Sequence, residues 1–279
     1  MNKEIDKKAL RWYLIFTICI SAILETLYIV TSGKLGLLIL LLMWTPGITA
    51  VCIKYKYYKG QSLLGMKLCS LKYLFAGIVI PIIYLSISYG IYWMCFNGTY
   101  LGTSYLADQI RKTYGFQAPD LFTILIILII GFISSILSAA GEEIGWRGFM
   151  YPVMERIWNR KTALIFSGGL WAMWHMPLII TGLYEADTIL SYGLIMFVIE
   201  IIGIAIILAW LRMASNSVLP AIMLHAGHNL FNQQIFRGIT NSGNSGYYVG
   251  EKGIITVIIV IGMAIIAMIL WKMKEKVTE

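Results

Sequence analysis

The sequence predicts an all-α membrane protein, a polytopic bundle of about eight transmembrane helices, and two observations support this. Of the 279 residues, 59% are hydrophobic and only 13% are charged, and the mean hydropathy is +0.77. A soluble domain carries about a quarter charged residues. The apolar residues also fall in long runs of roughly twenty, the length of a helix that crosses the hydrocarbon core. We therefore expect 1–279 to form a single membrane domain surrounded by lipid.

Each long apolar segment is expected to form one membrane-spanning helix. The predicted segments are approximately 10–31, 35–53, 73–96, 121–141, 162–183, 189–211, 217–236 and 253–271. The first lacks a small-residue cleavage site at its end, so no cleavable signal peptide is expected. The connection 97–120 contains an amphipathic stretch, YLADQIRKTYGF. The connection 237–252 is rich in Gly, Asn and Ser, which predicts a flexible turn.

Basic residues are distributed unevenly between the two predicted sides of the membrane. One side has few of them: Lys34, Arg111, Lys112, Arg237 and Lys252. The other side holds most of them: Lys3, Lys7, Lys8, Arg11, Lys54, Lys56, Lys59, Lys67, Lys72, Arg147, Arg156, Arg160, Lys161, Arg212, Lys272, Lys274 and Lys276. The positive-inside rule therefore predicts that both termini are cytoplasmic. The net charge of +8 is then membrane-flanking charge, and no nucleic-acid partner is expected because no basic face with interleaved aromatics is present.

Ionisable side chains inside a membrane are costly and usually mark function. The predicted spans and their edges contain few, and all three histidines of the chain are among them: Glu25, Glu142, Glu143, His175, Glu200, His225 and His228. The cysteines have no ligand-like spacing and are interpreted as small hydrophobic residues. They are Cys19, Cys52, Cys69 and Cys95.

The first polar cluster is AAGEEIGWRGFMYP at 139–152. Glu143 and Arg147 are four residues apart, so on a helix they share a face and can form an ion pair. Glu142 is left without an obvious partner, and a carboxylate without a cation in a low-dielectric site suits a general base. The alternative is a charged cap at the point where the fourth span leaves the lipid.

The second cluster is LWAMWHMPL at 170–178, in which His175 follows Trp171 by one helical turn. A single intramembrane histidine can also be a packing residue with an interhelical hydrogen bond.

The third cluster is LPAIMLHAGHNLFN at 219–232. His225 and Asn229 are four residues apart and share a helix face, whereas His228 points somewhat away. These residues are costly in a transmembrane helix unless they face a polar cavity. An interhelical hydrogen-bond network is the structural alternative.

Together the three clusters match the requirements of a water-activating hydrolase. A glutamate takes a proton from water, imidazoles orient that water or bind a metal, and an amide donor stabilises an oxyanion. His175 and His225 with one glutamate also form a zinc ligand set, but the HExxH arrangement is absent. The residues leave open whether zinc or no cofactor is used. No serine or cysteine motif lies near the histidines, and no aspartate lies within a span, so serine and aspartyl mechanisms are not favoured.

In this order and on these spans, the clusters resemble the CPBP family of CAAX proteases and bacteriocin-processing enzymes, also called the Abi family. Its pattern is EExxxR, then FxxxH, then HxxxN. The matching residues here are Glu142, Glu143 and Arg147, then Trp171 and His175, then His225 and Asn229. Trp171 replaces the usual phenylalanine and is expected to leave the chemistry untouched. The resemblance covers about 120–236, which is the expected protease-like core.

The resemblance implies roles for these residues. Glu142 would be the general base for the attacking water, and His175 would position that water or the scissile carbonyl. His225 and Asn229 would complete the site and stabilise the oxyanion. Glu143 and Arg147 would be a supporting pair, with Glu143 sharing in catalysis. Glu25, Glu200 and His228 do not match the motifs, and we expect them to be packing or network residues, because such polar groups often find interhelical partners.

The leading functional hypothesis is an intramembrane endopeptidase that acts on membrane-associated peptides or proteins, with access from the cytoplasmic side, where Glu142 is expected near the end of its span. The high Ile and Lys content favours a bacterial plasma membrane and a role in peptide processing, self-immunity or signalling. A different hypothesis is a non-enzymatic regulator or immunity protein that binds a membrane partner. A proton-coupled transporter would use the same residues as a relay, but the sequence lacks the internal repeat typical of transporters.

Overall fold

The computed structural model describes residues 2–96, 98–241 and 243–278, with side chains as far as Met273. Within these ranges the chain is a helical bundle with no strand, only an isolated antiparallel bridge between Tyr100 and Thr240. The predicted all-α class is confirmed. The elements are α1 (Lys3–Val30), α2 (Gly36–Tyr57), α3 (Leu71–Cys95), α4 (Thr103–Tyr114), α5 (Asp120–Glu143), η1 (Ile144–Met150), α6 (Tyr151–Ile157), α7 (Arg160–Ile180), α8 (Leu190–Ser215), α9 (Leu219–His228), η2 (Asn229–Phe236), η3 (Ser245–Tyr247) and α10 (Ile254–Thr278).

In the described residues, seven helical segments are long and apolar enough to cross a membrane. They correspond to the predicted spans, with one difference. The predicted span 217–236 is present as α9 followed directly by the π-helical segment η2, but it does not meet the same criterion of length and composition. Its polar residues, which include two histidines and two asparagines, explain this, because they are stabilised by the surrounding helices rather than by lipid.

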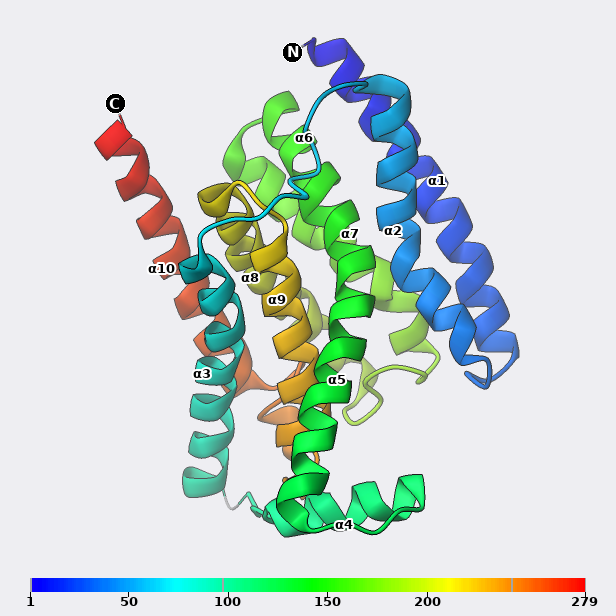
Figure 1. The fold of residues 1–279 in the computed structure, drawn as a ribbon, viewed down its shortest axis with the longest axis vertical. Coiled ribbons are helices and arrows are strands. Elements are labelled where there is room, and N and C mark those ends of the chain that lie inside the picture. The colour runs from blue at the N-terminus through cyan, green and yellow to red at the C-terminus, as the bar shows by residue number, and fades with distance from the viewer. Residues whose placement is uncertain (1, 97, 242, 279) are drawn as a thin grey trace.

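The two ends of the chain lie at the same end of the bundle (Figure 1). An even number of crossings requires this, and α9 with η2 supplies the eighth. The side chains of Lys274 and Lys276, which entered the predicted charge distribution, lie outside the described residues. The cytoplasmic location of the termini stays a prediction.

The fourth span is longer than expected. Asp120–Ile157 is one helical path of 38 residues, about 57 Å at the α-helical rise, against a hydrocarbon core of about 30 Å. Arg147 and Arg156 were predicted to lie in a loop after this span, but both are helical. The prediction was wrong because it ended the span where the hydropathy falls, at Glu142. The helix continues beyond this point because the polar side chains that follow face the protein interior.

Helix α9 lies in the middle of the bundle, where it packs against α3, α5 and α8 (Figure 1). Helix α2 packs against α5 and η1, and the contact is close at Gly141. A Cβ atom at this position would lie 2.6 Å from the backbone oxygen of Met43. The glycine therefore allows the two backbones to approach, as small residues do between membrane helices.

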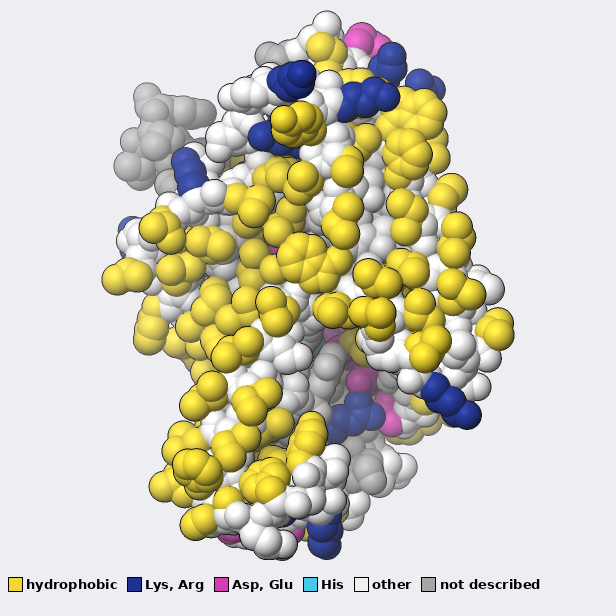
Figure 2. All heavy atoms as spheres, turned by 45° about the vertical axis from the view of Figure 1, so that its right-hand side comes forward, with side chains coloured by type: hydrophobic (Ala, Val, Ile, Leu, Met, Phe, Trp, Pro, Cys, Tyr) yellow, Lys and Arg dark blue, Asp and Glu magenta, His cyan; other side chains and the backbone are white. Residues whose placement is uncertain are grey.

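The amphipathic stretch of 97–120 forms α4, which lies across the end of the bundle opposite the termini (Figure 1). The face in Figure 2 is apolar over most of its height, with Lys and Arg side chains near the upper end and others in the lower part. Leucine and isoleucine side chains such as Ile23 and Ile129 are more than half exposed. This is the surface expected for a protein that is surrounded by lipid.

Candidate active site

One cavity of about 490 Å³ brings together four of the residues predicted from the sequence: Glu142, His175, His225 and Asn229. These side chains come from α5, α7, α9 and the first residue of η2. The remainder of the lining is mostly apolar, as in most small-molecule sites. Figure 2 shows a hollow in the lower half of the molecule with acidic and basic side chains at its edge.

Glu142 is 2% exposed and lies well inside the long helical path rather than at its end. The alternative of a charged helix cap is therefore wrong. The indole nitrogen Nε1 of Trp171 donates a hydrogen bond of 2.8 Å to Glu142 Oε2. No hydrogen bond from a described residue reaches the other carboxyl oxygen, Oε1, and Glu142 lines the cavity.

Tryptophan at this position makes a contact with Glu142 that the sequence pattern did not predict, and whether it leaves the chemistry untouched stays a prediction. Phenylalanine has no N–H group and cannot make this bond. The guanidinium of Arg147 also lies over the Trp171 ring, 3.9 Å from its centroid. Trp171 therefore contacts the carboxylate of one motif residue and the cation of another, and it fixes them relative to each other.

The predicted ion pair is present. Arg147 Nη1 lies 2.8 Å from Glu143 Oε1, and both side chains are buried. The same oxygen lies 2.9 Å from His225 Nδ1. A carboxylate in this position favours the imidazole form that carries its proton on Nδ1, and it leaves Nε2 for other partners. Glu143 and Arg147 thus orient His225, as outer residues do for many active-site histidines.

His175 is held from its own helix. Its Nδ1 lies 2.9 Å from the carbonyl oxygen of Trp171, so Nδ1 carries the proton and donates to that carbonyl. Edge-to-face contacts with Trp174 and Phe197 surround the ring. The Nε2 atom is left without a protein partner, on a side chain that lines the cavity.

Both helices that carry the glutamate and asparagine motifs change to π-helix at these residues. The segment η1 begins directly after Glu143, and η2 begins at Asn229. A π-helical turn shifts the direction of the side chains that follow, and such segments occur often at functional sites. The 3.6-residue period of an α-helix gives no signal for them in the sequence.

A second polar network lies next to the cavity. Its centre is Glu251, which accepts hydrogen bonds from Tyr184 and from Gln233 Nε2 and lies 3.4 Å from His228 Nε2. The other nitrogen of His228, Nδ1, is bonded to the hydroxyl of Tyr84. His228 is thus a network residue, as expected, and its partners lie on α3 and on the loop before α10.

Sequence reasoning missed Glu251, Tyr184 and Gln233, of which the last two line the main cavity. Glu251 was overlooked because 237–252 was interpreted as a flexible turn. In the described part of this segment, Glu251 and Lys252 are buried, and Lys252 Nζ pairs with Asp187 Oδ1 at 2.8 Å. The available signal was one acidic and one basic residue, Glu251 and Lys252, directly before the last apolar span.

Two other intramembrane carboxyl groups, those of Glu25 and Glu200, stood out in the sequence. Both carboxyl oxygens of Glu200 and the Oε1 atom of Glu25 are buried without a hydrogen-bond partner among the described residues. Both side chains are buried, and their interpretation as packing or network residues stays a prediction. Neither residue lines the 490 Å³ cavity.

The side chains around the cavity can be compared with the ligands of a zinc site. Zinc requires three or four nitrogen, oxygen or sulfur ligands at about 2.0–2.3 Å. In the part of the chain that the structure describes, no three His, Cys, Asp or Glu side chains lie close enough together to hold a metal ion. His175 and His225 share the cavity with Glu142, but this arrangement does not fit a bound zinc ion.

The cavity lies toward the end of the bundle opposite the termini. Its lining includes Tyr28 and Gly36, which flank the turn between α1 and α2, and this turn is remote from both chain ends in Figure 1. Access from the cytoplasmic side and cytoplasmic termini were both expected. This part of the cavity lining lies away from the termini, and both the orientation of the chain and the side of access stay predictions.

The fold and the cavity define a multi-pass helical membrane protein with a glutamate–histidine–asparagine site between its helices. Residues 122–231 match the family of Rce1-like type II CAAX prenyl endopeptidases. The chain is also 28% identical, over 178 residues, to a protein named CAAX prenyl protease 2 from Methanococcus maripaludis. That alignment covers 62% of this chain and 60% of the relative. Both comparisons confirm the predicted resemblance to CAAX-type intramembrane proteases, and the matched segment contains all three motifs.

Proposed function

We propose that this protein is an intramembrane endopeptidase in which Glu142 activates a water molecule. The observation that carries the proposal is that Glu142, His175, His225 and Asn229 line a single cavity among transmembrane helices. Each motif alone had a structural alternative. Their convergence from three separate segments favours a shared chemical task, because unpaired polar groups in a membrane are costly.

In this mechanism Glu142 takes a proton from water, and the water oxygen attacks the carbonyl carbon of the scissile peptide bond. The free Nε2 of His175 accepts a hydrogen bond from the same water and orients it. The carbonyl oxygen becomes an oxyanion, and the amide of Asn229 donates a hydrogen bond to it. His225 supplies a second donor from Nε2 when its ring is protonated, a form that the adjacent Glu143 carboxylate stabilises.

The tetrahedral intermediate then collapses. The carbonyl re-forms and the carbon–nitrogen bond breaks as Glu142 returns its proton to the leaving nitrogen, which gives a carboxylic acid and an amine. The acid then passes its remaining water-derived proton to the amine, so the products are one new carboxylate and one new ammonium group. Trp171 holds Glu142 Oε2 at 2.8 Å, so the proton is carried by the other oxygen of the same carboxyl group. Every proton is accounted for within the cavity.

We propose that no metal takes part. The ligand geometry above supports this, because the described carboxylate and imidazole groups do not converge on one point. The test is to incubate the purified full chain with a chelator, remove the complexed metals, and measure both activity and bound zinc. Activity that falls with zinc content and returns on zinc addition would contradict this part of the proposal.

The proposed substrate is a peptide, or the end of a protein, that lies at the membrane. The cavity wall combines polar groups with apolar side chains such as Ile39, Leu40 and Met43, which fits an extended segment with apolar residues. We place the protein in a bacterial plasma membrane and propose a role in peptide processing, self-immunity or signalling. Parallel assays with a prenylated peptide and an unmodified peptide of the same sequence show whether the protein cleaves unmodified peptides or requires the prenyl group that the name of its relative implies.

The experiment that tests the proposal uses the purified full chain in nanodiscs and a library of membrane-associated peptides, with cleavage measured by mass spectrometry. Glu142→Gln and His225→Ala are each expected to abolish cleavage. Glu200→Gln is the matched control, because it makes the same change at another buried carboxyl group that lies outside the cavity. Cleavage that survives both substitutions in the cavity would end the proposal.

A further inference from the structure

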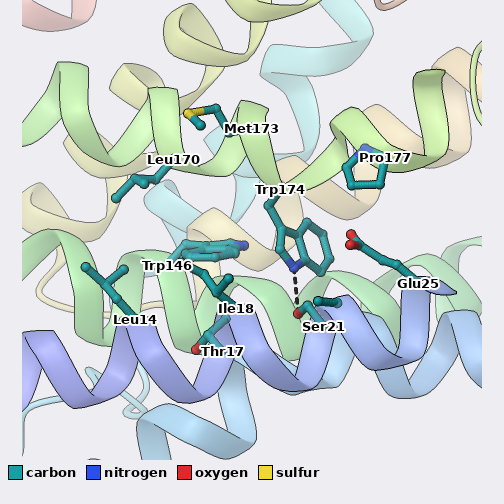
Figure 3. Close-up of a pocket in the computed structure, with 11 residues that line it drawn as sticks. Leu14, Thr17, Ile18, Ser21, Glu25, Trp146, Leu170, Met173, Trp174 and Pro177 are labelled. Atoms are coloured by element: carbon teal, nitrogen blue, oxygen red, sulfur yellow. Dashed lines mark hydrogen bonds between the residues drawn. The ribbon is translucent and has the colours of Figure 1, made fainter.

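A second cavity, of about 280 Å³, lies between α1 and α7 and is separate from the candidate active site. Its wall runs along α1 from Leu14 to Glu25, a rise of about 16 Å over eleven residues. Leu170, Met173 and Pro177 of α7 line the opposite side (Figure 3). The cavity is therefore a long, narrow and mostly apolar groove.

The groove opens to the lipid-facing surface. Ile18 and Met173, on its two sides, are 55% and 66% exposed. Trp174 donates a hydrogen bond of 2.8 Å from Nε1 to Ser21 Oγ, and this bond ties α7 to α1 across the groove (Figure 3). A membrane helix is 10–12 Å in diameter with its side chains, too wide to enter between two helices that are joined in this way.

Glu25 places one carboxyl group at the end of this apolar groove. The residue is 7% exposed, and its Oε1 atom has no hydrogen-bond partner. Figure 3 shows the carboxyl group beside Pro177 and next to the ring of Trp174. The nearby indole N–H of Trp174 already donates to Ser21, and the described residues that line the groove include no Lys, Arg or His.

The Oε1 atom of Glu25 is therefore free to pair with a donor from outside the described chain. A buried carboxylate without a cation or a hydrogen-bond donor is strongly unfavourable. Trp146 Nε1, on another residue of the wall, also has no hydrogen-bond partner among the described residues. Glu25 lies five residues before the end of α1, about 8 Å along the axis, so a charged group can reach it from the membrane–water interface.

We propose that this groove binds a single-chain cationic amphiphile from the bilayer. Its ammonium group pairs with Glu25, and its alkyl chain extends along α1 toward Leu14 and Leu170. The positive charge of the ammonium group complements the carboxyl group of Glu25, and the apolar length of the groove accommodates the alkyl chain. A lysine side chain from a neighbouring membrane protein would fill only the Glu25 end and leave most of the groove empty.

The test uses the purified full chain in nanodiscs and a dodecylamine probe with a photoreactive group on its alkyl chain. After illumination, we expect labelled peptides from the α1 and α7 walls of the groove. Unlabelled dodecylamine should compete, and dodecanol, which has the same chain without the charge, should compete at least about tenfold more weakly, as expected for the loss of a charge-assisted contact. Equal competition by the alcohol, or labels spread over all lipid-facing helices, would overturn the proposal.

Two variants and one control complete the experiment. Glu25→Gln should weaken dodecylamine competition by about tenfold or more for the same reason. Glu200→Gln, at a buried carboxyl group outside the groove, should leave it unchanged. Ala22→Phe fills the groove from an exposed position of its wall and should abolish labelling even with Glu25 intact.

Unchanged competition in Glu25→Gln would refute the assignment. If dodecylamine fails to label the groove while a transmembrane peptide with one lysine crosslinks there, the occupant is a protein partner and the proposal is wrong. Because the readout is binding, its result is independent of whether the protein cleaves peptides.

Discussion

The hydrogen bond from Trp171 to Glu142 gives the sharpest prediction about the candidate active site. Trp171→Phe removes the indole N–H group, keeps an aromatic ring under Arg147, and leaves the residues of the main cavity in place. Trp171 does not line that cavity, so it acts through Glu142 rather than on the substrate. We therefore expect kcat to fall and KM to stay unchanged.

The size of the effect follows from the bond that is lost. A hydrogen bond to a charged group contributes about 1.5–3 kcal/mol, and each 1.4 kcal/mol corresponds to about a tenfold change in rate. The full loss would reduce kcat by about 10- to 100-fold. Because water in the cavity can replace the donor in part, we expect the lower end, about tenfold.

The assay compares kcat and KM of the wild type and Trp171→Phe on one cleaved peptide. Trp174→Phe is the control, since it removes an indole donor from the same helix, but one that is bonded to Ser21 rather than to a cavity carboxylate. An unchanged kcat in Trp171→Phe, or equal losses in the two variants, would refute the idea that Trp171 positions the base. A rise in KM alone would instead mean that Trp171 contacts the substrate.

Three further predictions concern packing, pH and orientation. Gly141→Ala should lower the free energy of unfolding by about 1–3 kcal/mol through overpacking. Gly262→Ala is the control, because a Cβ atom there has no neighbour within 4 Å. Equal melting temperatures of the two variants would contradict the close contact of α2 with α5. Burial and the negative charge of a neighbouring carboxylate raise the pKa of Glu185 from its ordinary 4.5 to about 7. The folded state then binds the proton more tightly than the unfolded state, so stability should fall as pH rises from about 4.5 to about 7. Glu185→Gln should flatten this part of the profile of melting temperature against pH, and an unaltered profile would contradict the prediction. The positive-inside rule puts the termini on the cytoplasmic side and therefore the turn between α1 and α2 on the outer side. In a cysteine-free chain, an impermeant maleimide applied to intact cells should then label Ser32→Cys and not Lys59→Cys; the reverse pattern would invert the orientation.

Much of the fold could be predicted from the sequence because it depends on local properties. Long apolar runs predict the spans, since lipid forces every backbone polar group into an internal hydrogen bond. The pair of Glu143 and Arg147 followed from a spacing of four residues, and the shared cavity of His225 and Asn229 followed from the same period. The helical period fixes these relations within one element.

The boundaries of the polar spans were less predictable. Hydropathy ended the fourth span near 141, yet the helix continues through Arg147 to Ile157, because its charged side chains are paired inside the protein. The change to π-helix after Glu143 and at Asn229 leaves no periodic signal of its own. Local sequence patterns describe a helix in isolation and not the neighbours that stabilise it.

The sequence by itself determined that this is a helical membrane protein and which polar residues are out of place in lipid. Only the tertiary structure decided how they meet: Trp171 bonds to Glu142 across 29 residues of chain, His225 to Glu143 across 82, and Glu25 faces a groove with no partner. The physical reason is that residue spacing sets the face of a helix on which a side chain lies, whereas the packing of whole helices sets which faces touch.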